Sequence, residues 1–145
     1  MNNTQKKIKT LKTKCDKLWS EAIRTRDGEC ILCGRKDTLQ AHHWIHSRAQ
    51  GNLHRWDIRN GVTLCYGCHL HKVHTYASTD IIEQLKQAAF AKGIVTPEEM
   101  ESIANNHQIA KFGVEDMERV KEYLTDYLDS LDPNFYAVGG TNDEE

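Results

Sequence analysis

The sequence contains only two prolines among 145 residues and no run of 18 or more apolar residues. A membrane-spanning helix needs about 20 consecutive apolar residues, so the sequence predicts no membrane span. Residues 1–17 are rich in lysine but lack the apolar stretch of a secretory signal peptide. We therefore expect a cytoplasmic protein in a reducing compartment, where paired cysteines more often bind metal than form disulfides.

The chain as a whole also lacks an excess of either charge, since its net charge is −2 at pH 7. The two halves nevertheless differ. Residues 1–75 hold 14 lysines and arginines against 6 acidic residues, whereas residues 76–145 hold 5 against 15. The basic half predicts a polyanionic partner, although such charge blocks are also common on plain solvated surface.

The length allows one domain, or one small domain with an appended segment. Apolar residues recur at helical spacing between Ile8 and Ile23, which predicts an amphipathic helix over about 5–26 that ends at Asp27-Gly28. Cys15 lies on this apolar stripe, so we interpret it as a buried packing residue and not as a metal ligand. Residues 39–45 and 61–64 are expected to form strands, and residues 66–73 a short helix.

Three further helices are predicted in the second half of the chain. The first is expected to end near Lys92-Gly93. The second begins at the capping box Thr96-Pro97-Glu98-Glu99 and is expected to end near Gly113. The third spans about 115–131 and stops before Asp132-Pro133. The glycine-rich acidic residues 133–145 are expected to be disordered.

Four of the five cysteines form two Cys-x-x-Cys pairs, Cys30 with Cys33 and Cys65 with Cys68, separated by 31 residues. Each tight turn supplies two thiolates, and the two turns together complete the tetrahedral set that zinc prefers. Four thiolates leave no open coordination position, so the predicted zinc site is structural. Adventitious cysteine spacing is the alternative, and it requires two coincidences.

Three histidines accompany these cysteines. His42 and His43 are adjacent on a predicted strand, so their side chains should point to opposite faces, one to ligate a metal and the other to act on water. His69 directly follows Cys68, so the zinc site would fix its position near the histidine pair. A lone histidine would be interpreted as a surface or core residue, but three histidines tied to a zinc framework predict a catalytic site.

Together with Asn60, these residues resemble the HNH endonuclease family, whose ββα-metal fold is a β-hairpin plus a helix around a divalent ion. The matching elements are His42-His43, Asn60 and Cys65-x-x-Cys68-His69, and residues 55–60 and 64–69 are also similar to phage and prophage members such as NinG-like recombination proteins. The resemblance covers about residues 12–76. It implies a ββα-metal core, and with the elements predicted above we expect an α+β fold organised as follows: 1–29, an N-terminal amphipathic helix; 30–76, a zinc-stabilised ββα-metal core; 77–132, C-terminal helices; and 133–145, a disordered acidic tail.

The resemblance also implies roles for these residues. His43 would be the general base that acts on water, and Asn60 would orient His43 or brace the loop. His42 and His69 would ligate the catalytic divalent ion, which could be Mg²⁺, Mn²⁺, Ni²⁺ or Zn²⁺. His42 stands where the family often has aspartate, and two imidazole ligands favour a softer ion than magnesium. His46 is assigned no role, and His54 and His107 are expected to be ordinary surface residues.

The implied function is metal-dependent hydrolysis of DNA phosphodiester bonds by a phage-encoded endonuclease that acts in the bacterial host cytoplasm. Its partners would be DNA and the proteins of phage packaging or recombination. The expected phosphate contacts are the basic residues around the histidines, Arg48, Arg55, Arg59 and Lys72. The alternative is a non-catalytic zinc-stabilised nucleic-acid-binding module. The C-terminal helices would form a homodimer interface, or would simply pack onto the domain.

Overall fold

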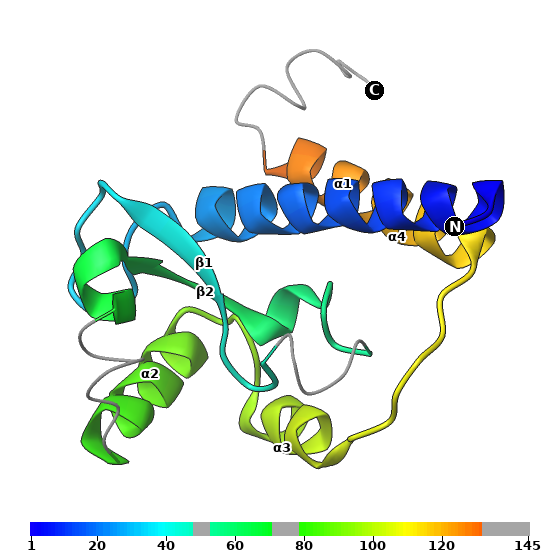
Figure 1. The fold of residues 1–145 in the computed structure, drawn as a ribbon. Coiled ribbons are helices and arrows are strands. Elements are labelled where there is room, and N and C mark those ends of the chain that lie inside the picture. Colours follow the sequence, from blue (N-terminus) through cyan, green and yellow to red (C-terminus); the bar gives the residue numbers. More distant parts are fainter. Residues whose placement is uncertain (48–52, 71–78, 132–145) are drawn as a thin grey trace, which may run out of the picture. The chain divides into compact units, whose positions relative to one another are not determined.

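The computed structural model describes residues 1–47, 53–70 and 79–131, and it divides the chain into two compact units. One unit comprises Met1–Arg26 and Phe112–Glu145, and the other comprises Asp27–Lys111. The elements in chain order are α1 (Asn3–Asp27), β1 (Leu39–His43), the short 3₁₀ helix η2 (Ile58–Asn60), β2 (Gly61–Cys65), α2 (Thr79–Ala91), α3 (Pro97–Asn105) and α4 (Val114–Ser130) (Figure 1).

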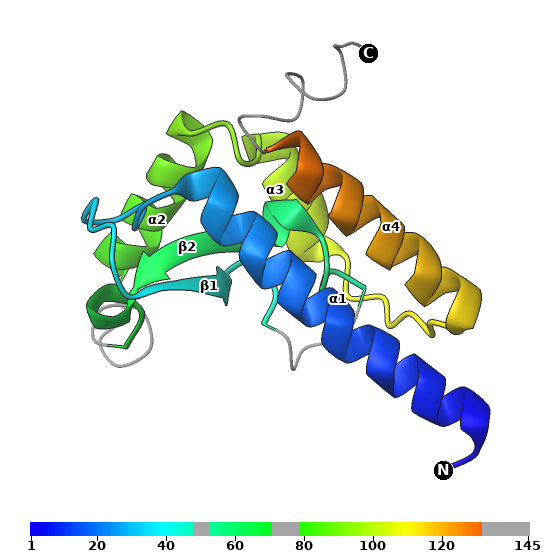
Figure 2. The same cartoon turned by 90° about the horizontal axis from the view of Figure 1, so that it is seen from above.

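The first unit is built from α1 and α4, which lie side by side (Figure 2). The buried side chains of α1 recur at helical spacing on one face, and they are Leu11, Cys15, Trp19, Ala22 and Ile23. Helix α4 contributes Met117 and Leu124, both fully buried. The Cys15 thiol lies 3.8 Å from the carbonyl oxygen of Met117, which confirms that Cys15 packs in an interior.

The second unit contains a two-stranded antiparallel sheet in which Leu39 faces Cys65 and His43 faces Gly61. Every residue of β2 is buried, so this strand is the centre of the unit. Its other edge is also occupied, because the N–H of Ile31 donates to the carbonyl of Thr63 and the N–H of Thr63 donates to the Asp27 carboxylate. The segment that carries the first cysteine pair is thereby fixed against the strand that leads into the second pair.

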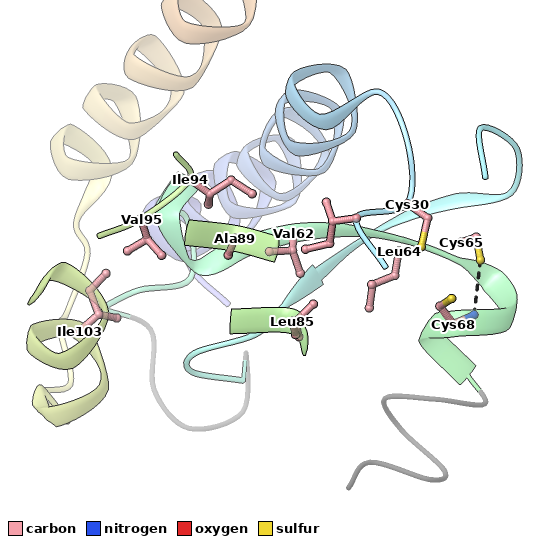
Figure 3. Close-up of a cluster of buried hydrophobic side chains, with 11 residues drawn as sticks. Cys30, Val62, Leu64, Cys65, Cys68, Leu85, Ala89, Ile94, Val95 and Ile103 are labelled. Carbon is pink, nitrogen blue, oxygen red and sulfur yellow. Dashed lines mark hydrogen bonds between the residues drawn. The ribbon is translucent and has the colours of Figure 1, made fainter. Parts of the chain in front are cut away.

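The core of this unit lies between β2 and the two helices that follow it (Figure 3). Val62 and Leu64 from β2 meet Leu85 and Ala89 from α2, and Ile103 comes from α3. Burying each large aliphatic side chain contributes roughly 1.5–3 kcal/mol, so this cluster is the main apolar support for the segments that carry the cysteines and histidines.

Two predicted boundaries were wrong. Helix α3 ends at Asn105 and not near Gly113, because Asn106 has an extended backbone and its N–H turns back to the carbonyl of Ile103. Strand β1 ends at His43 and not at Ile45, because the N–H groups of Ile45 and His46 donate to the Asn60 side chain. The capping box at Thr96 and Glu99 is confirmed, with both of its hydrogen bonds formed.

The chain is therefore an α+β protein, as predicted. Of the short helix expected over 66–73, residues 66–70 are helical and the remainder lies outside the described residues. The acidic segment 133–145 also lies outside them. No helix in the described part of the chain is long and apolar enough to cross a membrane.

Candidate functional site

The four predicted zinc ligands come together in the structure. The sulfur atoms of Cys30, Cys33, Cys65 and Cys68 all lie within 4.8 Å of one another, and those of Cys33 and Cys65 are 3.6 Å apart. A zinc ion with four sulfur ligands at about 2.3 Å has sulfur–sulfur separations of about 3.8 Å. The cluster therefore has the donor set and the dimensions to hold a structural zinc ion.

Local backbone hydrogen bonds shape the turns that present these thiols. In the first turn, the N–H of Gly34 donates to the carbonyl of Cys30, and the N–H of Cys30 donates to the carbonyl of Arg35. Gly34 has a φ of +79°, a conformation that costs a residue with a side chain more than it costs glycine. In the second turn, the N–H of Cys68 donates to the sulfur of Cys65 (Figure 3).

The thiols influence one another strongly. Burial raises the pKa of Cys30, but hydrogen bonds from the backbone at Cys65, Cys33 and Leu32 outweigh it and lower the pKa to about 7. The pKa of Cys68 is raised, first by burial and then by the neighbouring cysteines. One thiolate is thus favoured while another is disfavoured, so the cluster needs a cation before all four sulfurs can be ionised together.

His42 and His69, the predicted ligands of a second metal, also meet. His42 Nδ1 and His69 Nε2 are 3.1 Å apart, and the ring centroids are 4.9 Å apart. Two nitrogen ligands at about 2.1 Å from one ion, at an angle of ~90–110°, would lie ~3.0–3.4 Å apart. The contact is a hydrogen bond between the two rings, and its length also lies within the range for two ligands of one ion. Among the residues that the structure describes, only the cysteines form a group of three or more ligands, so this pair would supply two.

Gln40 orients His69 and was missed in the sequence. Its Oε1 lies 2.6 Å from His69 Nδ1, and because an amide oxygen can only accept, His69 Nδ1 is the protonated nitrogen. The neutral ring then has its lone pair on Nε2, the atom that faces His42. Gln40 precedes His42 by two residues on β1, so the alternation of a strand places both on one face and could have identified it.

His43 has a different partner from His42. Its Nε2 lies 2.8 Å from the carbonyl oxygen of Arg55, so Nε2 carries the proton and donates it to that carbonyl. In the neutral imidazole, Nδ1 then has the lone pair. The ring is half-buried and its direction is fixed by the backbone at Arg55. The two adjacent histidines therefore have different partners. Nδ1 of His42 faces His69, whereas Nε2 of His43 is bonded to the Arg55 carbonyl and its Nδ1 has the lone pair.

Asn60 is buried, with 1% of its surface exposed, and its whole side-chain amide is used on the backbone. Its Oδ1 accepts from the N–H groups of Ile45 and His46, and its Nδ2 donates to the carbonyls of His46 and His54. An amide can accept two and donate two hydrogen bonds, so its capacity is filled. Of the two roles that the resemblance implied, this geometry favours bracing the loop.

Three histidines expected to have no special role form a cluster beside this brace. His46 is buried, and its ring stacks on that of His54 with centroids 4.8 Å apart. The ring of His107 meets His46 edge-on at 5.2 Å. His46 Nε2 donates to the carbonyl of Ile103, and His54 Nε2 donates to that of Asn106. The C-terminal end of α3 thereby anchors the segment that precedes Arg55.

The predicted phosphate contacts divide into three groups. Arg59 forms ion pairs with Asp57 at 2.8 Å and Glu99 at 3.1 Å, and the Asp57 hydrogen bond is the main cause of its raised pKa. Because two carboxylates neutralise it, Arg59 mainly ties the loop to α3. The Arg55 guanidinium lies 4.8 Å over the ring of Trp56, which is itself buried. Arg48 and Lys72 lie outside the described residues.

No protein-family model matches the sequence, and no curated protein and no solved structure matches it.

Proposed function

We propose that the chain is a metal-dependent DNA endonuclease of the HNH class, as the resemblance in residues 12–76 implies. The observation that carries the proposal is the arrangement of three histidines. His42 Nδ1 and His69 Nε2 lie 3.1 Å apart, while the adjacent His43 is held by the Arg55 carbonyl. A protein that only bound nucleic acid would have no use for this arrangement.

In the proposed reaction, His43 removes a proton from the attacking water. Its Nε2 proton is committed to the Arg55 carbonyl, so Nδ1 is the nitrogen that accepts the proton. The same carbonyl then stabilises the imidazolium, because it accepts a hydrogen bond from the charged ring. The Asn60 brace keeps the backbone around His54 and Arg55 at the position that this hydrogen bond requires.

His42 and His69 would hold the divalent ion, with Gln40 fixing the ring of His69. When bound, such an ion neutralises charge on the scissile phosphate and stabilises the departing oxygen. Two protein ligands leave coordination positions open for water and phosphate oxygens. The four-cysteine cluster adjoins this pair in sequence through Cys68-His69, so zinc there would fix the start of the segment that carries His69.

A supercoiled-plasmid assay with added divalent ions tests the proposal. We expect wild type to nick or linearise the plasmid and His43→Ala to lose at least about 100-fold in rate, the usual scale of a general base, while DNA binding is kept. Gln108→Ala is the control, because this exposed side chain belongs to the same unit, lies outside the histidine cluster and should cleave like wild type.

Two outcomes would overturn parts of the proposal. Equal cleavage by wild type and His43→Ala would remove His43 as the base. Tight DNA binding by zinc-loaded wild type, without cleavage in Mg²⁺, Mn²⁺, Ni²⁺ or Zn²⁺, would identify the chain as the non-catalytic nucleic-acid-binding module.

A further inference from the structure

Helix α1 presents a face of lysines that has no part in the candidate catalytic site. Residues 1–15 contain five lysines and no acidic residue, although the protein as a whole is slightly acidic. Lys6, Thr10, Thr13 and Lys17 follow one another at the spacing of three or four residues that aligns side chains on one side of a helix. Lys9 and Lys14 flank this row, and all six of these side chains are exposed.

The lysine face points away from the packed side of its own unit. On a helix of 3.6 residues per turn, Cys15 lies opposite Lys6, and Cys15 is buried against the backbone of Met117 on α4. Two acidic side chains of α4, Asp116 and Glu118, make ion pairs with Arg119 and Lys121 of the same helix. Among the described residues, no ion pair involves Lys6, Lys9, Lys14 or Lys17. Their charge is available to an external partner.

The chemistry of this face favours a polyanion over a protein or a membrane. Protein interfaces have an apolar centre, whereas the row between the lysines contains threonines whose hydroxyls donate to the backbone of the preceding turn. A membrane-surface helix inserts its apolar face, but that face of α1 is buried within its own unit. Unpaired ammonium groups on a straight, polar face match a regular array of phosphates.

We infer that the lysine face of α1 is a second nucleic-acid-binding surface, which contacts the phosphate backbone independently of base sequence. The inference extends the proposed function by assigning a binding site to the unit that lacks the histidines. Lys6 and Lys17 are 11 residues apart, or about 16 Å along a helix axis. Duplex DNA carries one charge per ~1.7 Å of its axis, so several phosphates lie within that length. Contacts of this kind give affinity without sequence preference.

The test measures the salt dependence of DNA affinity. A labelled duplex is titrated with zinc-loaded protein in the His43→Ala background, so that the DNA stays intact, at several salt concentrations. The variant Lys9→Gln/Lys14→Gln/Lys17→Gln keeps helix propensity, because glutamine is nearly as good a helix former as lysine. Its matched control, Lys86→Gln/Lys92→Gln/Lys111→Gln, removes the same charge from the other unit.

We expect the slope of log affinity against log salt to fall by about 2–3 in the α1 variant, since each lost phosphate contact removes about 0.9. Affinity at low salt should fall at least about tenfold, and the control should keep the wild-type slope. An unchanged slope in the α1 variant would overturn the inference. If the α1 variant kept the DNA slope but lost binding to phosphatidylserine vesicles, the inference would also be overturned, and the lysine face would be identified as a membrane-binding surface.

The inference and the proposed nuclease activity fail separately. Binding that depends on the α1 lysines, without cleavage under any metal condition, keeps the binding surface and overturns the nuclease. Cleavage that depends on His43, with a salt slope unaffected by the α1 lysines, keeps the nuclease and overturns the binding surface.

Discussion

Replacing Asn60 by alanine removes four hydrogen bonds from the loop whose Arg55 carbonyl contacts His43. Two of them, to the N–H and the carbonyl of His46, are buried, while those to Ile45 and His54 are partly buried. A net hydrogen bond contributes about 1 kcal/mol, and an unsatisfied buried partner costs about 1–3 kcal/mol. Because water can reach the two partly buried groups, we expect Asn60→Ala to lower the free energy of unfolding by about 3 kcal/mol.

Urea denaturation at fixed zinc concentration measures this loss. Trp44 and Trp56 are in the same unit as Asn60, whereas Trp19 is in the other, so a Trp19→Phe background restricts the fluorescence signal to the relevant unit. For urea slopes of about 1–3 kcal/mol per molar, the midpoint should fall by ~1–3 M. Asn105→Ala is the matched control: this exposed residue ends α3, and its replacement should change stability by less than about 0.5 kcal/mol.

The same variant should lose DNA cleavage even where it remains folded, because the Arg55 carbonyl would no longer be held against His43. If Asn60→Ala lowers the free energy of unfolding by less than about 1 kcal/mol, the scale of a single hydrogen bond, then water replaces the amide. The reasoning that makes Asn60 a brace would then be refuted.

Three further predictions concern metals and pH. After dialysis against a mild chelator, which strips a site with only two histidine ligands, wild type should retain about one zinc per chain by elemental analysis. Cys68→Ser should lose this zinc, and Cys15→Ser should keep it because Cys15 lies outside the cluster; equal zinc in all three would contradict the assignment. Cleavage should be supported by Mn²⁺, Ni²⁺ or Zn²⁺ at least as well as by Mg²⁺, and a metal titration in which Mg²⁺ is fastest would count against two imidazole ligands. A hydrogen bond from the backbone of Thr96, and then one from Arg59, lower the pKa of Glu99 from its usual value of 4.5. The ionised carboxylate therefore stabilises the fold fully at pH values above 4.5, and this contribution is lost as the pH falls through the lowered pKa. The melting-temperature difference between wild type and Glu99→Gln should therefore shrink in acid, and a constant difference would contradict this sign.

The cysteine cluster and the meeting of His42 with His69 could be predicted because their signals are local. Each Cys-x-x-Cys pair encodes its own turn. His69 directly follows Cys68, so the position of the cluster also determines the position of His69. The two strands were expected as partners at 39–45 and 61–64, and the start of α3 followed from its capping box. Each Cys-x-x-Cys turn and the capping box depend on residues within a few positions of one another, and the metal that four thiolates require predicted that the two distant turns meet.

The features that were missed depend on partners distant in sequence. His46 donates to the carbonyl of Ile103, 57 residues away, and no periodicity in the sequence relates the two. The end of α3 at Asn105 was missed because no glycine or proline follows it, and Asn106 is instead held extended with His54 on its carbonyl. Arg59 was interpreted from its charge alone, but it is neutralised by Asp57, two residues earlier, and by Glu99, 40 residues later.

The cysteine cluster joins two turns that lie far apart in the sequence, and this has a consequence for folding. Cys33 and Cys65 are 32 residues apart, and closing a chain of that length costs about 3 kcal/mol in entropy plus a constant. During synthesis, the first cysteine pair leaves the ribosome well before the second and can hold zinc only as a half-site. Folding of this unit should therefore be limited by capture of the second pair, at a rate set by zinc supply as well as by the chain.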